Sequence, residues 1–383
     1  MAIRRPDSFR LGTGRGSVIA TVVLLALGFA VLGALLVLDK AVFLDPLPFK
    51  ATSGLALLQG TFTHKGEVED WGISHIDFLD WRQQNRVFEQ MAAFSPGELA
   101  FNLMAGNAAE RLSGELVSYN YFPLLGVRPA AGRFFTAEED GKPFTHPVVV
   151  LSHGLWQRRF GGDPAVVGRT LDLNGQPYRV VGVAPRGFRG LTDKADAWIP
   201  SAMPPGPTYV ANRRMRWLEG IARLKPGATL AQAQRDMDRV TAGLAQRYPE
   251  MNKGMGVRLS PFRALWFGEL GGGLRLLTLG AALALLFAVL DAAALLAPRR
   301  PSAAGAPLAV RQIVARAVAV SLCGGALGLA LAAWLLHALL PRSGLTFPSF
   351  LDLTLGWAVI GGVLALALLC GVAIGLAGAR ADR

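Results

Sequence analysis

Few residues of this chain have the types and spacings that chemistry requires. Residues 12–16, GTGRG, could cradle a phosphate, but they follow a basic tail rather than a strand, and no G-x-x-x-x-G-K-[ST] motif occurs. Ser152 and His153 would be a nucleophile and a base, yet they lack the G-x-S-x-G elbow. Three histidines are too scattered in sequence for a metal cluster, and we interpret them as surface or loop residues: His64, His75 and His146. We therefore predict no catalytic residue, no metal site and no cofactor bound by this chain.

The elements that must carry the function are four apolar segments and the region between the first two of them. The four segments are 17–38, 270–297, 317–340 and 354–379. Each of these segments is long enough, as an α-helix, to cross about 30 Å of hydrocarbon. The first has 22 uncharged residues and no A-x-A-like site after it, so we interpret it as an uncleaved anchor rather than a signal peptide. Since 52% of all residues are hydrophobic and residues 39–268 have ordinary soluble composition, we expect an α-helical membrane protein, one span plus three, with a large aqueous domain.

The net charge of +12 reflects membrane topology rather than a nucleic-acid surface. Lysine and arginine accumulate in the cytoplasmic loops of membrane proteins. Arginines are concentrated in residues 1–16, 298–316 and 380–383, whereas residues 341–353 have only Arg342. We therefore expect cytoplasmic tails and a cytoplasmic loop at the first three places, and a large domain outside the cytoplasm, in the periplasm if the cell has two membranes. We therefore expect contact with the lipid bilayer and no nucleic-acid partner.

Local patterns predict an α+β fold for the large domain. Residues 72–94 read as one amphipathic helix capped by Ser74, and residues 229–248 as a second helix capped by Thr229. The remaining patterns are typical of strands: 146–156, 170–184 with a hairpin turn at Asn174-Gly175, 216–224 and 257–262. We expect two lobes, one of the sequence flanks, about 41–115 and 213–262, and a β-rich one of about 116–212.

Several longer phrases resemble a known family. They are DFLDWRQQNRVFEQMAAF, LVSYNYFPLLGVRPAAGRFFTAEED, VVVLSHGLWQRRFGGDPAVVGRTLDLNGQPYRVVGVAPRGFRG and WIP. Together they resemble the periplasmic core domain of MacB/FtsX-type (type VII) ABC transporter permeases, closest to the acidobacterial duplicated orphan kind, from about Ala41 to Phe262.

The resemblance implies a bacterial inner-membrane permease that lacks its own ATPase. The resemblance implies that the chain works in a dimer that passes ATP-driven motion to the periplasm. ATP and Mg²⁺ would then be bound by a partner ABC ATPase. The implied partners are that ATPase, a second permease copy or paralogue, and in some systems a periplasmic adaptor. Substrates across the family include macrolides, peptides, lipoproteins and siderophores, so the family does not identify the substrate here.

We interpret the residues of these phrases as structural. Glycines and an Asn-Gly pair permit backbone turns, and large aromatic residues anchor a β-rich core. The set is Phe122, Trp156, Phe160, Gly162, Gly168, Asn174, Gly175 and Gly182.

Within the spans, small residues four apart indicate close helix contacts, since they let backbones approach where lipid offers no hydrophobic drive. The pairs are Gly324 with Gly328 and Gly371 with Gly375. Asp291 is an acid within a span, which is costly at the membrane centre. We interpret it as an interhelix polar contact rather than part of a proton pathway.

The segment 298–316 departs from typical relatives, in which the corresponding stretch resembles a long helix that docks onto the ATPase. Here it has prolines at 298, 301 and 307 and no acid, leaving only 308–317 as a helix. The candidate coupling residues are Arg299, Arg300, Arg311 and Arg316. Two hypotheses follow. In the first, the chain is a permease subunit for export or efflux of a small molecule or peptide, and one form of this hypothesis makes it the degenerate half of a heteromeric permease. In the second, it is a non-transporting regulatory or assembly scaffold.

Overall fold

The computed structural model describes residues 15–44, 54–97, 99–105, 108–268, 270–296, 306–339, 342, 348 and 351–380. The chain forms two compact units, described separately below. Unit 1 comprises Met1–Asp45 and Phe267–Arg383, and unit 2 comprises Pro46–Trp266.

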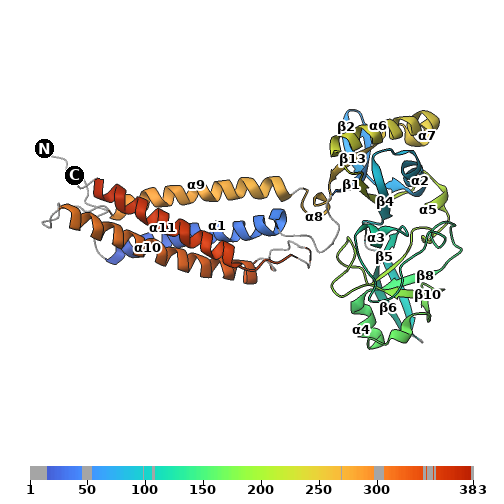
Figure 1. Cartoon of the computed structure of the whole chain (residues 1–383), viewed down its shortest axis with the longest axis horizontal. Coiled ribbons are helices and arrows are strands. Elements are labelled where there is room, and N and C mark those ends of the chain that lie inside the picture. Colours follow the sequence, from blue (N-terminus) through green and yellow to red (C-terminus); the bar gives the residue numbers. More distant parts are fainter. Residues whose placement is uncertain are drawn as a thin grey trace, which may run out of the picture. The chain divides into compact units, whose positions relative to one another are not determined.

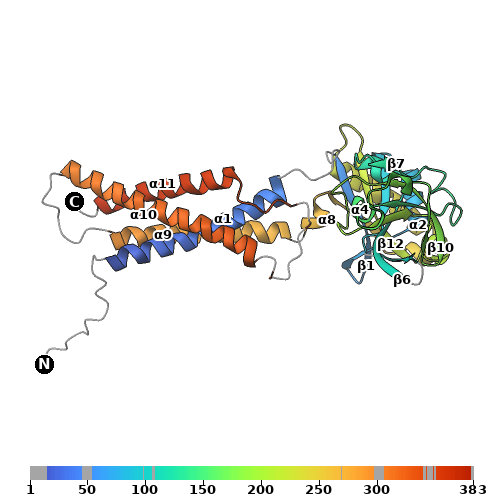
Figure 2. The ribbon, with the colours of Figure 1, turned by 90° about the horizontal axis from the view of Figure 1, so that it is seen from below.

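Unit 1 is a bundle of four helices that lie side by side in two views (Figures 1 and 2). Each is long and apolar enough to cross a membrane. Two of them continue as short π-helices, η1 and η3. The bounds are α1 Arg15–Asp39, η1 Lys40–Leu44, α9 Leu270–Leu296, α10 Ala306–Trp334, η3 Leu335–Leu339 and α11 Trp357–Arg380.

Helix directions in the bundle follow from its contacts. Along α10, Gly324 faces Leu25 and Gly328 faces Phe29, so α1 and α10 are parallel. Along α11 the order is reversed, because Gly371 faces Val318 and Gly375 faces Val314. The apolar core contains side chains of all four helices, among them Leu25, Leu285, Ala317 and Val363.

Helix α10 begins earlier than expected. We predicted a cytoplasmic loop to residue 316 with a short helix at 308–317, but one continuous helix starts at Ala306. Pro307 is then the second helical residue, where the absent N–H would have no partner in the helix and the fixed φ favours initiation. Arg311 and Arg316 therefore lie on the same helix as the span, while Arg299 and Arg300 lie outside the described residues.

Unit 2 is an α+β domain in which a run of hydrogen-bonded strands has the order β11-β8-β10-β9-β5-β6-β4-β12-β1-β13. Strands β2, β3 and β7 pair beside this path, with β1, β12 and β10. The bounds are β1 Leu55–His64, β2 Glu67–Trp71, β3 Ile73–Ser74, α2 His75–Gln84, β4 Phe88–Phe94, β5 Leu99–Ala105, β6 Ala108–Val117, α3 Tyr121–Leu124, β7 Ala131–Gly132, β8 Val148–Leu151, α4 His153–Phe160, η2 Pro164–Val166, β9 Thr170–Leu173, β10 Gln176–Val183, β11 Ala197–Pro200, α5 Thr208–Ala211, β12 Arg216–Leu224, α6 Leu230–Arg247, α7 Pro249–Asn252, β13 Met255–Pro261 and α8 Ala264–Phe267.

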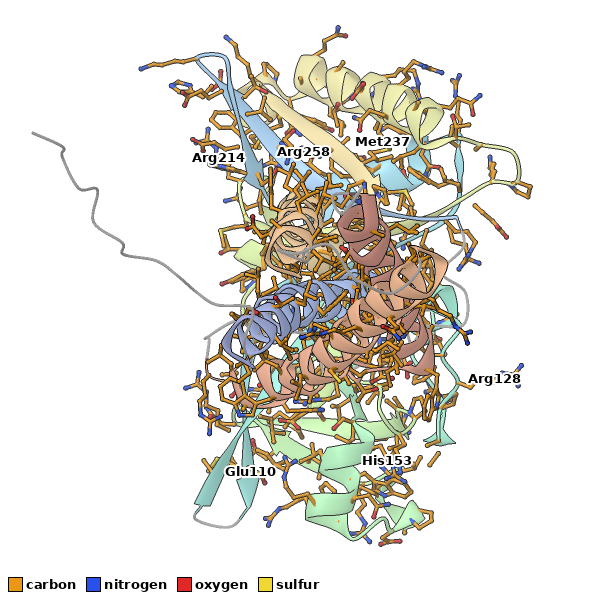
Figure 3. The ribbon with its side chains drawn as sticks, turned by 90° about the vertical axis from the view of Figure 1, so that its left-hand side faces the viewer. Glu110, Arg128, His153, Arg214, Met237 and Arg258 are labelled. Atoms are coloured by element: carbon orange, nitrogen blue, oxygen red, sulfur yellow. The ribbon has the colours of Figure 1, made fainter. Side chains whose placement is uncertain are left out.

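One part of unit 2 is the antiparallel sheet β4-β12-β1-β13, on which helix α6 packs. In the register of its two central strands, Leu57 lies opposite Ile221. The fully buried Met237 on α6 joins Leu58 and Leu259 of the sheet in one core cluster. Figure 3 shows Met237 on α6 and Arg258 on the adjacent strand β13.

The other part is a ring of strands. Along the path β6-β5-β9-β10-β8-β11 each strand pairs with the next, and β11 pairs back onto β6 in parallel, from Ala197 opposite Gly114 to Pro200 opposite Val117. Figure 1 shows several of these strands together with α4. A second core cluster fills this part, with Phe101, Leu112 and Val149 among its members. Strands β5 and β6, which we expected mostly with the sequence flanks, thus contribute to the core of the middle region.

The first predicted amphipathic helix is wrong in its second half. Helix α2 has the predicted Ser74 cap but ends at Gln84, and residues 88–94 form β4, which pairs with β12. Asn85 ends the helix: its Nδ2 donates to the carbonyl oxygens of Trp81 (3.0 Å) and Arg82 (2.9 Å), and its Oδ1 accepts from the Phe88 N–H (3.2 Å). Pairing with a distant strand therefore overrides the helical spacing of the apolar residues. Similarly, the strand predicted through Trp156 stops at Leu151, because Ser152 caps α4.

The other local predictions are confirmed. Helix α6 starts after Thr229, whose hydroxyl accepts from the Gln232 N–H at 3.2 Å in a capping box. Strands β12 and β13 occupy the predicted segments. Asn174 and Gly175 form the turn between β9 and β10, with φ of 55° and 78°, as a type I′ hairpin turn requires.

Candidate functional site

Two predicted glycines of α10 lie against α1. A Cβ atom at Gly328 would lie 2.7 Å from Phe29 Cβ and 2.9 Å from the Ala26 carbonyl oxygen, and one at Gly324 would lie 2.9 Å from Leu25 Cβ. Real Cβ atoms do not approach other atoms this closely, so the absence of a side chain permits this helix contact.

The second glycine pair lies against the backbone of α10. Hypothetical Cβ atoms at Gly371 and Gly375 would each lie 2.6 Å from a Cα atom, of Val318 and Val314 respectively. In the same contact the Ser321 hydroxyl donates to the Ala367 carbonyl oxygen at 2.7 Å. Helices α1, α10 and α11 therefore pack at close range through small residues, together with an interhelical hydrogen bond of the kind found in membrane bundles.

The charged candidates of unit 1 face outward. Asp291 on α9 and Arg311 and Arg316 on α10 are exposed, and none has a hydrogen-bond or ion-pair partner within the described part of the chain. Asp291 therefore makes no interhelix polar contact with the described residues. These groups can contact a membrane or a partner, but no arrangement among them supports catalysis.

The residues of the family-like phrases occupy structural positions in unit 2. Phe122 is fully buried, with its ring stacked on Phe134 at 4.0 Å between centroids and edge-on to Trp198 at 5.5 Å. Trp156 and Phe160 on α4 are half-buried against the second core cluster. A Cβ at Gly182 would lie 2.1 Å from the Arg133 carbonyl oxygen, next to the antiparallel pairing of β7 with β10. Gly162 and Gly168 have φ of 75° and 97°, which glycine adopts readily.

The residues that could have done chemistry do not form a site. The Ser152 hydroxyl accepts from the Leu155 N–H at 3.1 Å as the cap of α4, and the His153 ring lies edge-on to Trp156. Figure 3 shows His153 toward the same end of unit 2 as Glu110, whose carboxylate pairs with Arg158 of α4 at 3.2 Å. Across the described ranges no three His, Cys, Asp or Glu side chains are grouped for a metal.

One histidine prediction is wrong. His64 is exposed and stacks on Phe62, and His146 is half-buried beside Thr145, but His75 is buried, with 6% of its surface exposed. Burial, and then the charge of Arg82, lowers the pKa of His75 to about 4. Its Nδ1 has no hydrogen-bond partner among the residues described. The position begins α2, where a surface residue is common, so the local pattern could not reveal that the helix end is covered.

Glu115 is a buried carboxylate that the sequence patterns did not single out. Its Oε2 accepts from the Tyr121 hydroxyl (3.0 Å) and Trp198 Nε1 (2.8 Å), and its Oε1 accepts from the Thr192 N–H (2.7 Å). Burial raises the pKa of Glu115, against the opposing effect of these hydrogen bonds. The donors come from α3, from β11 and from the loop before β11, and all three join these segments to strand β6, so the arrangement is structural.

A second buried ionic cluster joins α2 to the chain before and within β12. The carboxylate of Asp77 accepts from Arg213 (2.5 Å), Arg216 (2.7 Å) and Asn252 Nδ2 (2.9 Å). Arg213 also bonds Asp80 at 2.5 Å. Because the donors are more than 130 positions away in sequence, no local signal could have found the cluster. Its carboxylate accepts from three donors, as a buried charged group requires.

A comparison with family models places this chain in a family. A family model described as the MacB-like periplasmic core domain matches residues 18–240, from within α1 to within α6. Among solved structures, a domain of a protein described as a permease from Porphyromonas gingivalis is 17% identical, covering 57% of this chain and 93% of that one, with a TM-score of 0.43. The periplasmic region of MacB from Actinobacillus actinomycetemcomitans is 15% identical, covering 54% and 89%, with a TM-score of 0.40. The extracellular domain of the ABC-type transporter YknZ from Gram-positive bacteria is 12% identical, covering 53% and 99%, with a TM-score of 0.39.

No match was found among curated proteins. The family match alone spans more than half of the chain and begins in the first apolar helix, as expected for a domain anchored to a membrane. The chain belongs to the family with a MacB-like periplasmic core domain.

Proposed function

We propose that the chain is the permease subunit of an ABC transporter, in which a separate ATPase drives motions of the four-helix unit that reach a periplasmic domain. The family match over residues 18–240 carries this proposal. The four apolar helices support it, because a single anchor would suffice to hold a domain at a membrane. Export or efflux of a small molecule or peptide is the reaction that we infer, with ATP and Mg²⁺ bound by the partner.

The chain provides a simple route for motion. Helix α1 precedes unit 2 in sequence and α9 follows it, and these two helices pack together: a Cβ at Gly28 would lie 2.8 Å from a methyl carbon of Leu285. A small shift of α9 against α1, as in other shear motions of packed helices, would thus pull on both connections to unit 2. In this proposal α1, α10 and α11, with their close backbone contacts, form the more rigid body.

Helix α10 supplies the candidate contact with the ATPase. Its 29 residues span about 44 Å at 1.5 Å per residue, longer than the hydrocarbon layer of about 30 Å. The first turns, with exposed Arg311 and Arg316, would then extend beyond the hydrocarbon. In the proposed orientation both termini and this helix end are cytoplasmic in a bacterial inner membrane, and Arg299 and Arg300 add charge beside them.

Capture of the partners tests the proposal. We expect affinity-tagged full-length protein, solubilised from its native membrane, to retain an ABC ATPase and a second permease, either another copy or a paralogue, with or without a periplasmic adaptor. Trapping the complex with a non-hydrolysable ATP analogue should change cross-linking between cysteines placed in unit 2 of the two permeases. Recovery of no ATPase and no second permease would refute the transporter function.

A charge reversal with a matched control tests the coupling residues. Arg311→Glu with Arg316→Glu, or Arg299→Glu with Arg300→Glu, should reduce ATPase capture, because a basic contact becomes acidic. Arg342→Glu is the control: Arg342 is also exposed, but belongs to the segment that we place on the opposite side of the membrane. Cysteine accessibility from each side should confirm unchanged orientation, and equal capture by all variants in the correct orientation would exclude these arginines from docking.

One observation favours a second function, that of a non-transporting regulatory or assembly scaffold. Only residues 297–305 lie between α9 and α10, and this stretch has two prolines and no acid. The family resemblance implies a longer coupling helix there. A scaffold would retain its partners without an ATPase, and addition of nucleotide would leave the cross-linking in unit 2 unchanged.

A further inference from the structure

The ring of strands in unit 2 is hollow at one end. A cavity of about 590 Å³ is lined by core residues of β5, β6, β9, β10 and β11, and by two covering segments, 144–147 and 203–207. The residues at its base are buried members of the second core cluster, among them Phe101, Leu173 and Ile199. Ligand pockets of 300 to 1,000 Å³ commonly lie in the mouths of β-barrels, so both the size and the place are those of a small-molecule site.

The chemistry of the lining is uncharged. In the described part of the chain no Asp, Glu, His, Lys or Arg lines the cavity, although the protein as a whole carries a net charge of +12. Proline has no N–H group, so the walls offer few backbone donors; the lining prolines are Pro147, Pro177, Pro204, Pro205 and Pro207. A charged ligand would lose its hydration here without gaining a counter-charge.

Two polar side chains of β10 line the same cavity. The Tyr178 hydroxyl and the Gln176 amide have no hydrogen-bond partner among the residues that the structure describes. Tyr178 is 8% exposed, and an unpaired hydroxyl at such a place is available to a ligand that brings an acceptor. A few polar groups on an apolar wall are the usual means of orienting a small ligand.

The exposure and backbone conformation of Phe144 are a second observation that points to a ligand. It lies at the rim with 44% of its surface exposed, and its backbone has a φ of 62°. That conformation is unfavourable for a residue with a Cβ atom, and a large apolar side chain gains nothing from exposure to water. Strained backbone of this kind concentrates at ligand-binding sites.

The rim is held in place by hydrogen bonds. The Phe144 N–H donates to the Ala202 carbonyl oxygen at 3.1 Å, which joins segment 144–147 to the residue directly before segment 203–207. Asp140 Oδ1 accepts from the Ser201 hydroxyl at 2.9 Å and the Ala202 N–H at 3.0 Å. The cavity mouth is therefore built before any ligand arrives, which lowers the ordering cost of binding.

We propose that this mouth, from Phe144 at the rim to Tyr178 on the wall, binds a neutral, mainly apolar small molecule that has a hydrogen-bond acceptor. Aromatic or aliphatic rings of the ligand pack between Phe144, Met203 and the prolines. Its acceptor accepts a hydrogen bond from the Tyr178 hydroxyl. The site does not depend on ATP coupling, and it would serve a transporter or a ligand-regulated scaffold.

Benzophenone is a suitable probe, because it is neutral, has two rings and a carbonyl acceptor, and inserts into nearby C–H bonds on illumination. We expect illuminated full-length protein in detergent to carry the label in peptides containing residues 144–147 and 199–207, in addition to labels in the membrane helices. Tyr178→Phe should reduce the labelling of the mouth by roughly fivefold, as loss of one neutral hydrogen bond predicts, and leave the labelling of the helices unchanged. The carboxylate analogue 4-benzoylbenzoate should label the mouth at least about tenfold less.

Phe144→Gly separates a ligand contact from a structural role. The variant relieves the backbone strain, so its Tm should equal or exceed that of the wild type, while labelling of the mouth falls about tenfold with loss of the aromatic contact. Lys65→Gly is the matched control, since Lys65 also has a positive φ, 50°, in the β1–β2 turn, and its labelling should not change. The proposal fails if benzophenone labels only the membrane helices, or if 4-benzoylbenzoate labels the mouth as strongly as benzophenone does. It also fails if the mouth of Phe144→Gly is labelled as strongly as that of the wild type, or if added phospholipid abolishes labelling of the mouth. Capture of the ATPase is measured separately, so either proposal can fail alone.

Discussion

Alanine at Gly371 and Gly375 should destabilise the helix bundle strongly for so small a change. The new Cβ atoms would lie 2.6 Å from the Cα atoms of Val318 and Val314, whereas carbon atoms pack best at about 3.5 to 4.0 Å. Helix α11 must therefore move away from α10 by roughly 1 Å, and overpacking of this kind costs about 1–3 kcal/mol per site. Alanine also favours the helix over glycine by about 0.5–1 kcal/mol, so we expect a net loss of about 1 kcal/mol per site, and of at most about 2.5 kcal/mol.

The same helix offers a matched control. Gly361 and Gly362 also lie in α11, but a Cβ there would have nothing within 4 Å. Alanine at these positions should leave stability unchanged or raise it by about 0.5–1 kcal/mol. The two pairs of variants therefore differ in predicted sign, which removes any general effect of alanine in a membrane helix.

Full-length protein in mild detergent can be titrated with SDS, with thiol modification of Cys370 as the signal in a Cys323→Ser background. Cys370 is half-buried on α11 beside Gly371, so its accessibility reports separation of α11 from the bundle. We expect the transition to occur at lower SDS for Gly371→Ala and Gly375→Ala, and at unchanged or higher SDS for the control pair. Equal transitions for all four variants would refute the close backbone contact.

Three further changes concern unit 2 and can be followed by urea unfolding of the full-length protein. His75 has a pKa of about 4 in the folded protein and an ordinary value of 6.5, so between these values the unfolded chain binds a proton that the folded chain does not. The free energy of unfolding should therefore be highest above about pH 6.5 and fall by about 3 kcal/mol toward pH 4. In His75→Gln the fall should be smaller. Glu115→Gln replaces one carboxylate oxygen by an NH2 group, so that a donor faces either the Thr192 N–H or the Tyr121 and Trp198 donors. The change should cost about 1–3 kcal/mol at neutral pH; equal stability would show that the cluster repacks. Thr229→Ala removes the cap of α6 and should cost about 1 kcal/mol, whereas Thr229→Ser should restore it.

Local sequence patterns predicted the structure correctly where the conformation of a segment depends only on residues within that segment. Helix α6 was predicted with its cap because Thr229 and the apolar spacing lie within one segment. The Asn174-Gly175 turn was predicted because its backbone conformation depends on those two residues. The helix predicted through residue 94 failed because β4 pairs with β12, more than 120 positions later, and that pairing overrides local spacing.

The candidate sites show the same division. The glycine pairs in the spans could be identified from spacing, but only the structure assigns Gly324 and Gly328 to α1 and the other pair to α10. The cavity at the mouth of the ring could not be predicted, because its lining combines Phe101 with residues up to position 207. No sequence signal marked Phe144 either, since its N–H group bonds the carbonyl oxygen of Ala202, a residue distant in sequence.

The sequence by itself determined the four membrane-length helices and the single large domain between the first two. Bilayer thickness imposes a length on any apolar helix that crosses it, and this length can be read along the chain. Only the tertiary structure decided that β11 returns to β6 to close a ring, that His75 is buried and that the ring has an uncharged cavity at one end. These features arise from contacts between distant segments, whose free energy depends on partners that local composition does not specify.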